Sequence, residues 1–127
     1  MYEILSGAHK GLAMLSVILT LCWTFVVLAA SRTGPLKLAR VQRLAYVGAA
    51  ASTGLVAITG LAVMAAGSWL ATAFPWAGLV AVAGHGIAGA RSRSALVAGN
   101  GGAAIGATIF QIALLFVAYG LMTVKPF

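Results

Sequence analysis

Six polar side chains inside or near long apolar stretches are the candidates for chemistry in this chain. They are His9, His85, Gln111, Ser16, Thr20 and Thr24. Two imidazoles on facing helices can hold a haem iron, and an amide with hydroxyls can line a path for a small polar solute. Glu3 is the only acidic residue. The chain therefore lacks the intramembrane carboxylate on which proton-coupled exporters and most cation pathways depend.

A haem shared between the two histidines is not expected, because they differ in depth. His9 falls within about two helical turns of the outer end of its apolar stretch, and His85 falls about six residues, some 9 Å, from the inner end of its own. The imidazoles are therefore predicted to lie in opposite leaflets. A haem held by His85 from two protomers, or by one histidine and a partner subunit, stays open. No metal site is expected from two histidines, one cysteine and no clustered carboxylates.

Hydrogen bonding is the expected role of the histidines. His85, in Gly84-His85-Gly86, is predicted to be neutral and bonded across a helix contact to Gln111 or to a threonine hydroxyl. His9 is predicted to cap its helix or contact headgroups. No nucleophile–base–acid arrangement, phosphate loop or Cys-x-x-Cys pair occurs in the sequence, so we expect a protein that is not an enzyme.

The composition indicates a membrane protein, because 62% of residues are hydrophobic, 7% are charged, and no charged residue occurs between Leu44 and Ala90. Crossing a hydrocarbon core of roughly 30 Å takes about 20 apolar helical residues. The sequence predicts four such spans in a single transmembrane domain over residues 1–127, at about 5–30, 44–66, 74–90 and 101–122. Trp69 and Trp76 would lie at headgroup level, and Pro75 suits a first helical turn.

Basic residues divide unevenly among the connectors and predict the orientation. The first connector carries Arg32, Lys37, Arg40 and Arg43, the third connector carries Arg91 and Arg93, and the second carries none. These two basic connectors are expected to be cytoplasmic, with both termini outside. The same residues would attract anionic headgroups, and no nucleic-acid partner is expected. Residues 36–43 either continue the second span as a helix in the headgroups or form a topology-setting loop, and both interpretations stay open.

Small residues recur at helical spacing and predict a compact four-helix bundle, because helices in lipid approach one another through such residues. One stripe is Gly48, Ser52, Val56 and Gly60, and a second is Ala77, Ala81, His85 and Gly89. The last span carries Gly102-x-x-x-Gly106. The expected fold class is an all-α integral membrane bundle with N-out/C-out topology.

The layout resembles that of the SirB-like group of small bacterial four-span proteins. The likeness rests on His9-Lys10-Gly11-Leu12 with the small-polar stripe that follows, the basic first connector, Thr59-Gly60-Leu61-Ala62 before Trp69, and a last span closing with residues 118–126, AYGLMTVKP. That group usually carries a Pro-His pair and an Asp at the start of its second span, and residues 40–46 of this chain have neither. The resemblance implies a multi-pass protein of the bacterial inner membrane with a non-enzymatic function.

Three functions are compatible with these features. The first is an accessory or structural subunit of a larger inner-membrane assembly or homo-oligomer, in contact with lipids and other membrane subunits. The alternative is a transporter or channel for a neutral or anionic small solute. Its path would be lined by the hydroxyls of Ser16, Thr20 and Thr24 together with Gln111 and His85. The third is a haem-binding electron-transfer subunit, although no cofactor is the first expectation.

Overall fold

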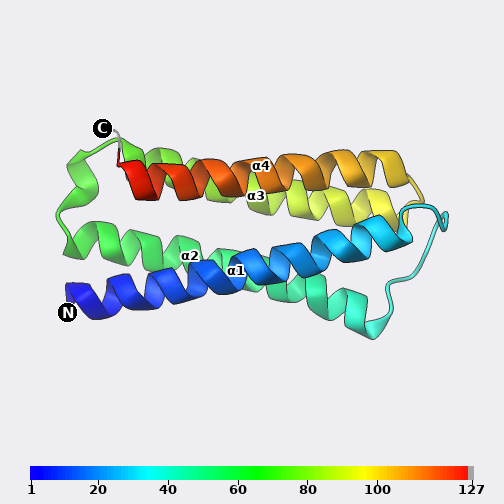
Figure 1. Ribbon diagram of the computed structural model, residues 1–127, viewed down its shortest axis with the longest axis horizontal. Helices are drawn as coiled ribbons and strands as arrows, with labels where there is room; N and C mark the ends of the chain where they lie inside the picture. Colours follow the sequence, from blue (N-terminus) through cyan, green and yellow to red (C-terminus); the bar gives the residue numbers. More distant parts are fainter. Residues whose placement is uncertain (126–127) are drawn as a thin grey trace.

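The structure is a computed structural model, and it describes residues 1–125. Four long helices make up most of this part, namely α1 (Tyr2–Ala30), α2 (Arg40–Ala66), α3 (Phe74–Val97) and α4 (Gly101–Val124). A short 3₁₀ helix, η1 (Trp69–Ala71), lies between α2 and α3. Each long helix runs opposite to the one before it (Figure 1), so the predicted all-helical four-helix bundle is confirmed. Pro126, part of the motif quoted above, lies outside the described residues.

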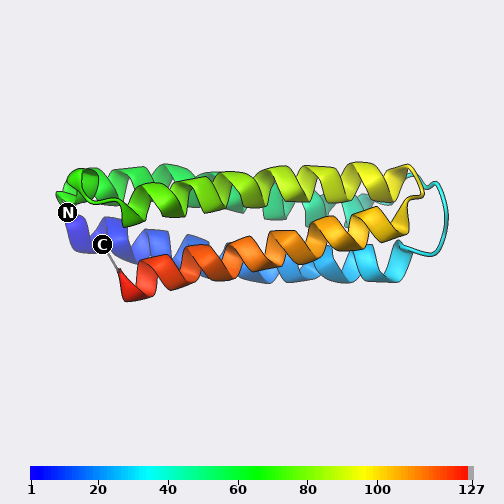
Figure 2. The same cartoon turned by 90° about the horizontal axis from the view of Figure 1, so that it is seen from above.

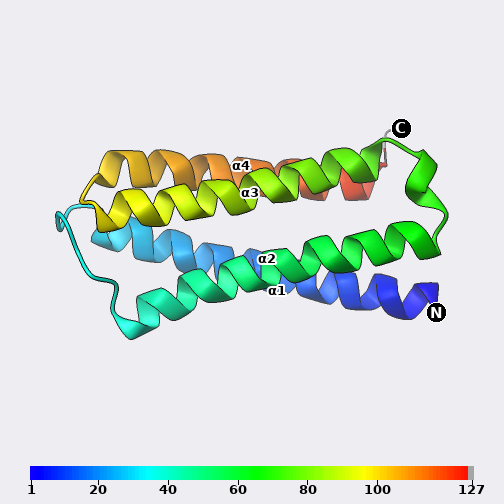
Figure 3. The same cartoon turned by 180° about the vertical axis from the view of Figure 1, so that it is seen from behind.

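Three of the helices, α1, α2 and α4, are long and apolar enough to cross a membrane, which indicates a membrane protein. α3 does not reach the same apolarity, although a span over 74–90 is predicted, because it carries His85 in its middle and Arg91 and Arg93 in its last turns. It is 24 residues long, as α4 is. Figure 3 shows that α3 leads from one end of the bundle to the other, between the end of α2 and the start of α4. α3 therefore covers the same axial distance as its neighbours.

Two helices extend further than the predicted spans at the end of the bundle that holds the first connector and the α3–α4 turn. We call it the basic end, because Arg32, Lys37, Arg40, Arg43, Arg91 and Arg93 lie there. α2 begins at Arg40 instead of Leu44, and α3 continues to Val97 instead of Ala90. The helical interpretation of residues 36–43 therefore holds from Arg40 onward, while residues 36–39 belong to the connector. At this junction the N–H of Ala39 donates to Oε1 of Gln42 at 2.8 Å, which satisfies a backbone donor at the helix start.

The bundle consists of two closely packed antiparallel pairs, α1 with α2 and α3 with α4 (Figure 1). In Figure 2, seen from above, the α3–α4 pair lies in front of the α1–α2 pair. Small residues lie at these contacts, as the stripes predict. A Cβ atom on Gly48 of α2 would lie 3.3 Å from the Leu19 side chain of α1, and one on Gly84 of α3 would lie 2.9 Å from Leu114 of α4. Gly102 and Gly106 are different, because both are exposed and no atom lies within 4 Å of a Cβ built at either. The expectation that this pair packs inside the bundle is wrong for the described chain.

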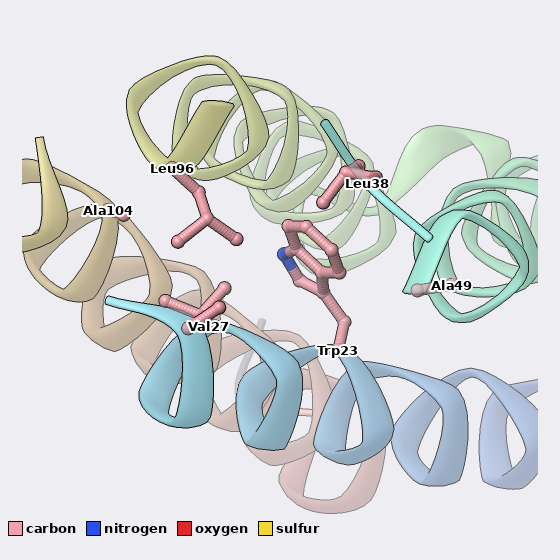
Figure 4. Packing of buried hydrophobic residues seen from close by; sticks show 7 residues of the cluster. Trp23, Val27, Leu38, Ala49, Leu96 and Ala104 are labelled. Atoms are coloured by element: carbon pink, nitrogen blue, oxygen red, sulfur yellow. The ribbon is translucent and has the colours of Figure 1, made fainter. Parts of the chain in front are cut away.

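An apolar cluster fills the basic end of the bundle, as Figure 4 shows. It comprises Trp23, Val27, Ala30, Leu38, Ala49, Leu96 and Ala104. Leu38 comes from the connector between α1 and α2, which is fastened to α3 where the Leu36 N–H donates to the Val97 carbonyl at 3.2 Å. The nearby Gly99 has φ +80°, and a Cβ there would collide with Pro35, so the α3–α4 turn needs a glycine.

Both chain ends lie at the other end of the bundle (Figure 1). The first connector and the α3–α4 turn share the opposite end, so the bundle gathers six exposed basic residues there: Arg32, Lys37, Arg40, Arg43, Arg91 and Arg93. The single acidic residue, Glu3, is at the terminal end. The molecule therefore has a strong charge asymmetry along its axis, in the sense that the sequence predicts.

Candidate functional site

The inward face of α1 carries most of the polar contacts that cross the bundle. Its buried residues are Ser16, Thr20, Trp23, Val27 and Ala30, which alternate at spacings of four and three. This is the spacing of a seam that faces partner helices along its whole length. Because three of these five residues carry a hydrogen-bonding group, polar contacts follow one another down the interior. We call the set formed by Ser16, Thr20, Trp23, Thr53, His85, Ser92, Thr108 and Gln111 the polar chain.

The first link of the polar chain joins α1 to α2. The hydroxyl oxygens of Ser16 and Thr53 lie 3.0 Å apart, and both residues are buried. Thr53 donates its own proton to the Ala49 carbonyl one turn back at 2.8 Å. Ser16 must therefore be the donor between the two hydroxyls, and Thr53 the acceptor.

The second link centres on His85, which is 2% exposed and lies near the middle of α3. Its Nδ1 lies 2.9 Å from the backbone carbonyl of Gln111, so Nδ1 carries a proton. In the neutral ring Nε2 is then the acceptor, and it faces the Thr20 hydroxyl at 3.3 Å and the Gln111 amide nitrogen at 3.4 Å. His85 thus bonds to both kinds of partner that the sequence suggests, on α1 and on α4.

Gln111 contributes both its backbone and its side chain to this link. A Cβ on Gly89 of α3 would lie 2.7 Å from the Gln111 amide nitrogen, so a glycine at this position makes room for the amide. The side chain is 3% exposed, and its Oε1 has no hydrogen-bond partner among the described residues. A buried amide oxygen without a partner is energetically costly, typically by about 1–3 kcal/mol. It is the one acceptor in this cluster that is left unsatisfied.

The third link was not found from the sequence. The indole N–H of Trp23 donates to the Ser92 hydroxyl at 2.9 Å, and the oxygens of Ser92 and Thr108 lie 3.0 Å apart. All three residues are at most 2% exposed. Ser92 lies between Arg91 and Arg93. These two arginines indicate a solvated connector, so Ser92 was not predicted to be buried. The spacing of seven from His85 to Ser92 places both on one face of a helix and is the signal that was available.

His9 and Thr24 lie outside the polar chain. The Nδ1 of His9 is 2.9 Å from the Thr59 hydroxyl of α2, and its ring packs beside Gly60, so His9 makes a contact between two helices. It does not cap its helix, because the N-cap of α1 is Met1, and the contact with headgroups stays a prediction. Thr24 donates to the Thr20 carbonyl of its own helix at 2.8 Å.

The two histidines therefore belong to separate contacts at different depths. His9 precedes Thr20, the α1 partner of His85, by eleven residues of the same helix, an axial distance of about 16 Å. His85 lies near the middle of α3, because this helix extends to Val97, and its predicted placement in the inner leaflet stays a prediction. The separation in depth still excludes one haem iron held by His9 and His85 of the same chain.

The basic residues around the apolar cluster form a second group of interest. The Arg93 guanidinium of α3 lies over the Tyr46 ring of α2, 5.1 Å from its centroid, and Tyr46 in turn packs edge-on against Trp23 at 5.2 Å. Within residues 1–125 no group of three or more His, Cys, Asp or Glu side chains is placed to hold a metal ion.

No family model, curated protein or solved structure matches this chain.

Proposed function

We propose that this chain is a small structural or accessory subunit of a membrane assembly, and that it is not an enzyme. The proposal rests on how its helix faces are used. The polar groups of the interior bond mainly to one another and hold the two helix pairs together, whereas one outer face of α4 has the features of a helix–helix contact without a partner in the chain.

That outer face carries the single observation on which the proposal depends. Gly106, Ala113 and Gly120 follow one another at intervals of seven, and Gly102, Ile109 and Phe116 form the neighbouring line. Among residues 1–125, no atom outside the local helix backbone lies within 4 Å of a Cβ built at any of the three glycines. Ile109 and Phe116 are 63% and 72% exposed. A seven-residue repeat with small residues in one line is the pattern by which membrane helices approach closely.

Five glycines of α2 and α3 that follow such patterns meet side chains of neighbouring helices. Gly48 and Gly60 of α2 face Leu19 and His9, and Gly78, Gly84 and Gly89 of α3 face side chains of α4. Open space is also found beside Gly7 and Gly11 of α1, Gly54 of α2 and Gly86 of α3. We assign the contact with a second copy of this chain or another membrane subunit to the stripe on α4, because it repeats over three steps and has exposed Ile109 and Phe116 beside it.

Sizing of the native particle tests this proposal. In mild detergent and in lipid nanodiscs, the wild-type chain is expected to run as an oligomer or with a copurifying subunit, well above its own 12.8 kDa. Gly106→Leu should shift it to the monomer, because leucine blocks close approach of a helix. Gly11→Leu is the matched control, since Gly11 of α1 is also exposed with open space around it. A wild-type monomer that copurifies with nothing would contradict the proposal.

The proposed setting is a bacterial inner membrane, with all four helices crossing it. α3 joins the end of α2 to the start of α4, so it must cross wherever these two helices do. The gathering of basic residues at one end supports a cytoplasmic location for that end and an N-out/C-out orientation. The bacterial source and the likeness to the SirB-like group rest on the sequence layout alone, and no residue role is carried over.

A transporter or channel for a neutral or anionic solute is the second candidate, favoured by one observation. Gln111 Oε1 is a buried acceptor without a partner among the described residues, beside His85 and Thr20. A small donor molecule would satisfy it. Solute flux into liposomes that requires Gln111 and disappears in Gln111→Leu, while Thr59→Val retains it, would support this candidate. Tight liposomes with the wild-type protein would oppose it.

A further inference from the structure

The two helix pairs leave a groove between α2 and α3 on the outer surface of the bundle. Its volume is about 630 Å³. Small side chains line both walls, mainly Ala50, Gly54 and Ala57 of α2 and Ala83, Gly86 and Ala90 of α3. Figure 3 presents the two helices side by side on this face. The lining is almost entirely apolar, so in a bilayer the groove takes hydrocarbon.

The length of the groove distinguishes between two apolar occupants. Its wall on α3 extends from Leu79 to Ala90, which lie eleven positions or about 16 Å apart along the helix. This is close to half of a hydrocarbon core of roughly 30 Å, the depth that one acyl chain of one leaflet reaches. A transmembrane helix from another chain would need a groove along the full thickness. The length therefore favours a lipid chain.

One end of the groove is positively charged. On α3 the lining face continues from Ala90 to Arg93, and on α2 it continues back from Ala50 to Tyr46, one turn away in each case. The Arg93 guanidinium lies 5.1 Å from the Tyr46 ring centroid and so bridges the two walls where the groove ends. Arg93 is exposed, so its N–H groups remain available for acceptor oxygens.

A second arginine lies on the same line. Arg43 precedes Ala50 by seven residues of α2, so it shares the face of the groove lining, and it is exposed. The only acidic side chain of the chain, Glu3, is at the opposite end of the bundle. No internal carboxylate competes for these two arginines, and an anion from outside the chain can pair with them.

We propose that the α2–α3 groove is a binding site for an anionic phospholipid of the leaflet at the basic end. One acyl chain fills the groove, and Arg93 together with Arg43 holds the phosphate. The inference is independent of the subunit proposal, because that proposal depends on the outer face of α4.

Native mass spectrometry of the full chain from nanodiscs tests the lipid site. The nanodiscs contain equal amounts of phosphatidylglycerol and phosphatidylcholine with identical acyl chains. The wild-type chain is expected to retain one phosphatidylglycerol in preference to phosphatidylcholine. Arg93→Gln and Arg43→Gln should each weaken this retention about fivefold, the factor that one basic residue near the headgroups supplies. Arg32→Gln is the control, because Arg32 lies at the same end and belongs to the first connector, away from the groove lining.

Filling the groove tests the acyl-chain part of the proposal. Gly54→Leu and Gly86→Leu place a side chain in it, and both are compatible with the fold because no atom lies within 4 Å of a Cβ at either position. Each should lower retention of phosphatidylglycerol at least tenfold, whereas Gly11→Leu should leave it unchanged. Equal retention of the two lipids would overturn the proposal. So would an Arg32→Gln effect as large as that of Arg93→Gln, or loss of a dimer without loss of lipid in Gly86→Leu, which would make a second copy the occupant.

Discussion

Thr20 of α1 and His85 of α3 meet across the centre of the bundle, with 3.3 Å between the threonine hydroxyl and Nε2 of the imidazole. Each residue belongs to a different helix pair, so this contact joins the two halves of the molecule. The next contact towards the basic end, from Trp23 to Ser92, does the same. Direct packing between α1 and α3 is otherwise sparse. Polar side chains therefore help to set how one pair sits on the other, beside the apolar cluster at the basic end.

Removal of the Thr20 hydroxyl tests the strength of this contact. Thr20→Val keeps the shape of the side chain and removes one interhelical hydrogen bond, which in membrane proteins is worth about 0.6 kcal/mol on average and about 1.7 kcal/mol at most. His85→Leu is expected to cost more, about 1–3 kcal/mol, because it also strips the Gln111 amide of its partner. Reversible unfolding in mixed micelles measures both. A neutral His85→Leu would show that the polar chain does not stabilise the bundle.

The indole N–H of Trp23 gives a second test with a matched residue at the other end of the bundle. Trp23→Phe keeps an aromatic ring against Tyr46 but leaves the Ser92 hydroxyl without its donor, at an expected loss of about 1 kcal/mol. Trp76 donates to the Leu70 carbonyl, but its side chain is half exposed, so Trp76→Phe should change the free energy of unfolding by less than half as much. Equal effects would mean that burial of the N–H makes no difference.

Two glycines of α3 provide a test of the room around Gln111. Glycine in a helix interior is less favourable than alanine by roughly 0.5–1 kcal/mol, so Gly86→Ala, in open space, should stabilise the bundle. At Gly89 the added Cβ would lie 2.7 Å from the Gln111 amide nitrogen and push it away from His85. We expect Gly89→Ala to be less stable than Gly86→Ala by about 1 kcal/mol or more, measured by thermal unfolding in detergent. Gly89→Ala as stable as Gly86→Ala would contradict this packing.

The membrane class, the four helices and the use of small residues at their contacts could be predicted from the sequence, because each depends on composition or helical spacing within one segment. Gly48 and Gly60 on α2 are examples. The outer position of Gly102 and Gly106 could not be predicted, because a small-residue pair has the same spacing whether its partner is in the same chain or in another one. Which face of α4 turns inward depends on its packing with α3.

The candidate site was predicted in part for the same reason. His85 and Gln111 are strongly polar residues in apolar helices, and such residues seek each other. Ser92 was missed because two flanking arginines indicate a connector, whereas the helix continues through those arginines. Long basic side chains can extend to the headgroups from within a helix, so charge alone does not mark where a helix ends.

Orientation in the membrane is the prediction on which the sidedness of the lipid site depends. Six exposed basic residues at one end of the bundle, against Lys10 and Lys125 nearer the other, predict that the connector between α1 and α2 is cytoplasmic. A reporter that is active only outside the cytoplasm should therefore be active when it is fused to either terminus, and a reporter that is active only in the cytoplasm should be inactive there. Simultaneous replacement of Arg32, Lys37, Arg40 and Arg43 by glutamine removes four of these six charges and should yield a mixed population of orientations. Replacement of Lys10 alone should change nothing, and a terminal reporter that is active in the cytoplasm would reverse the predicted orientation.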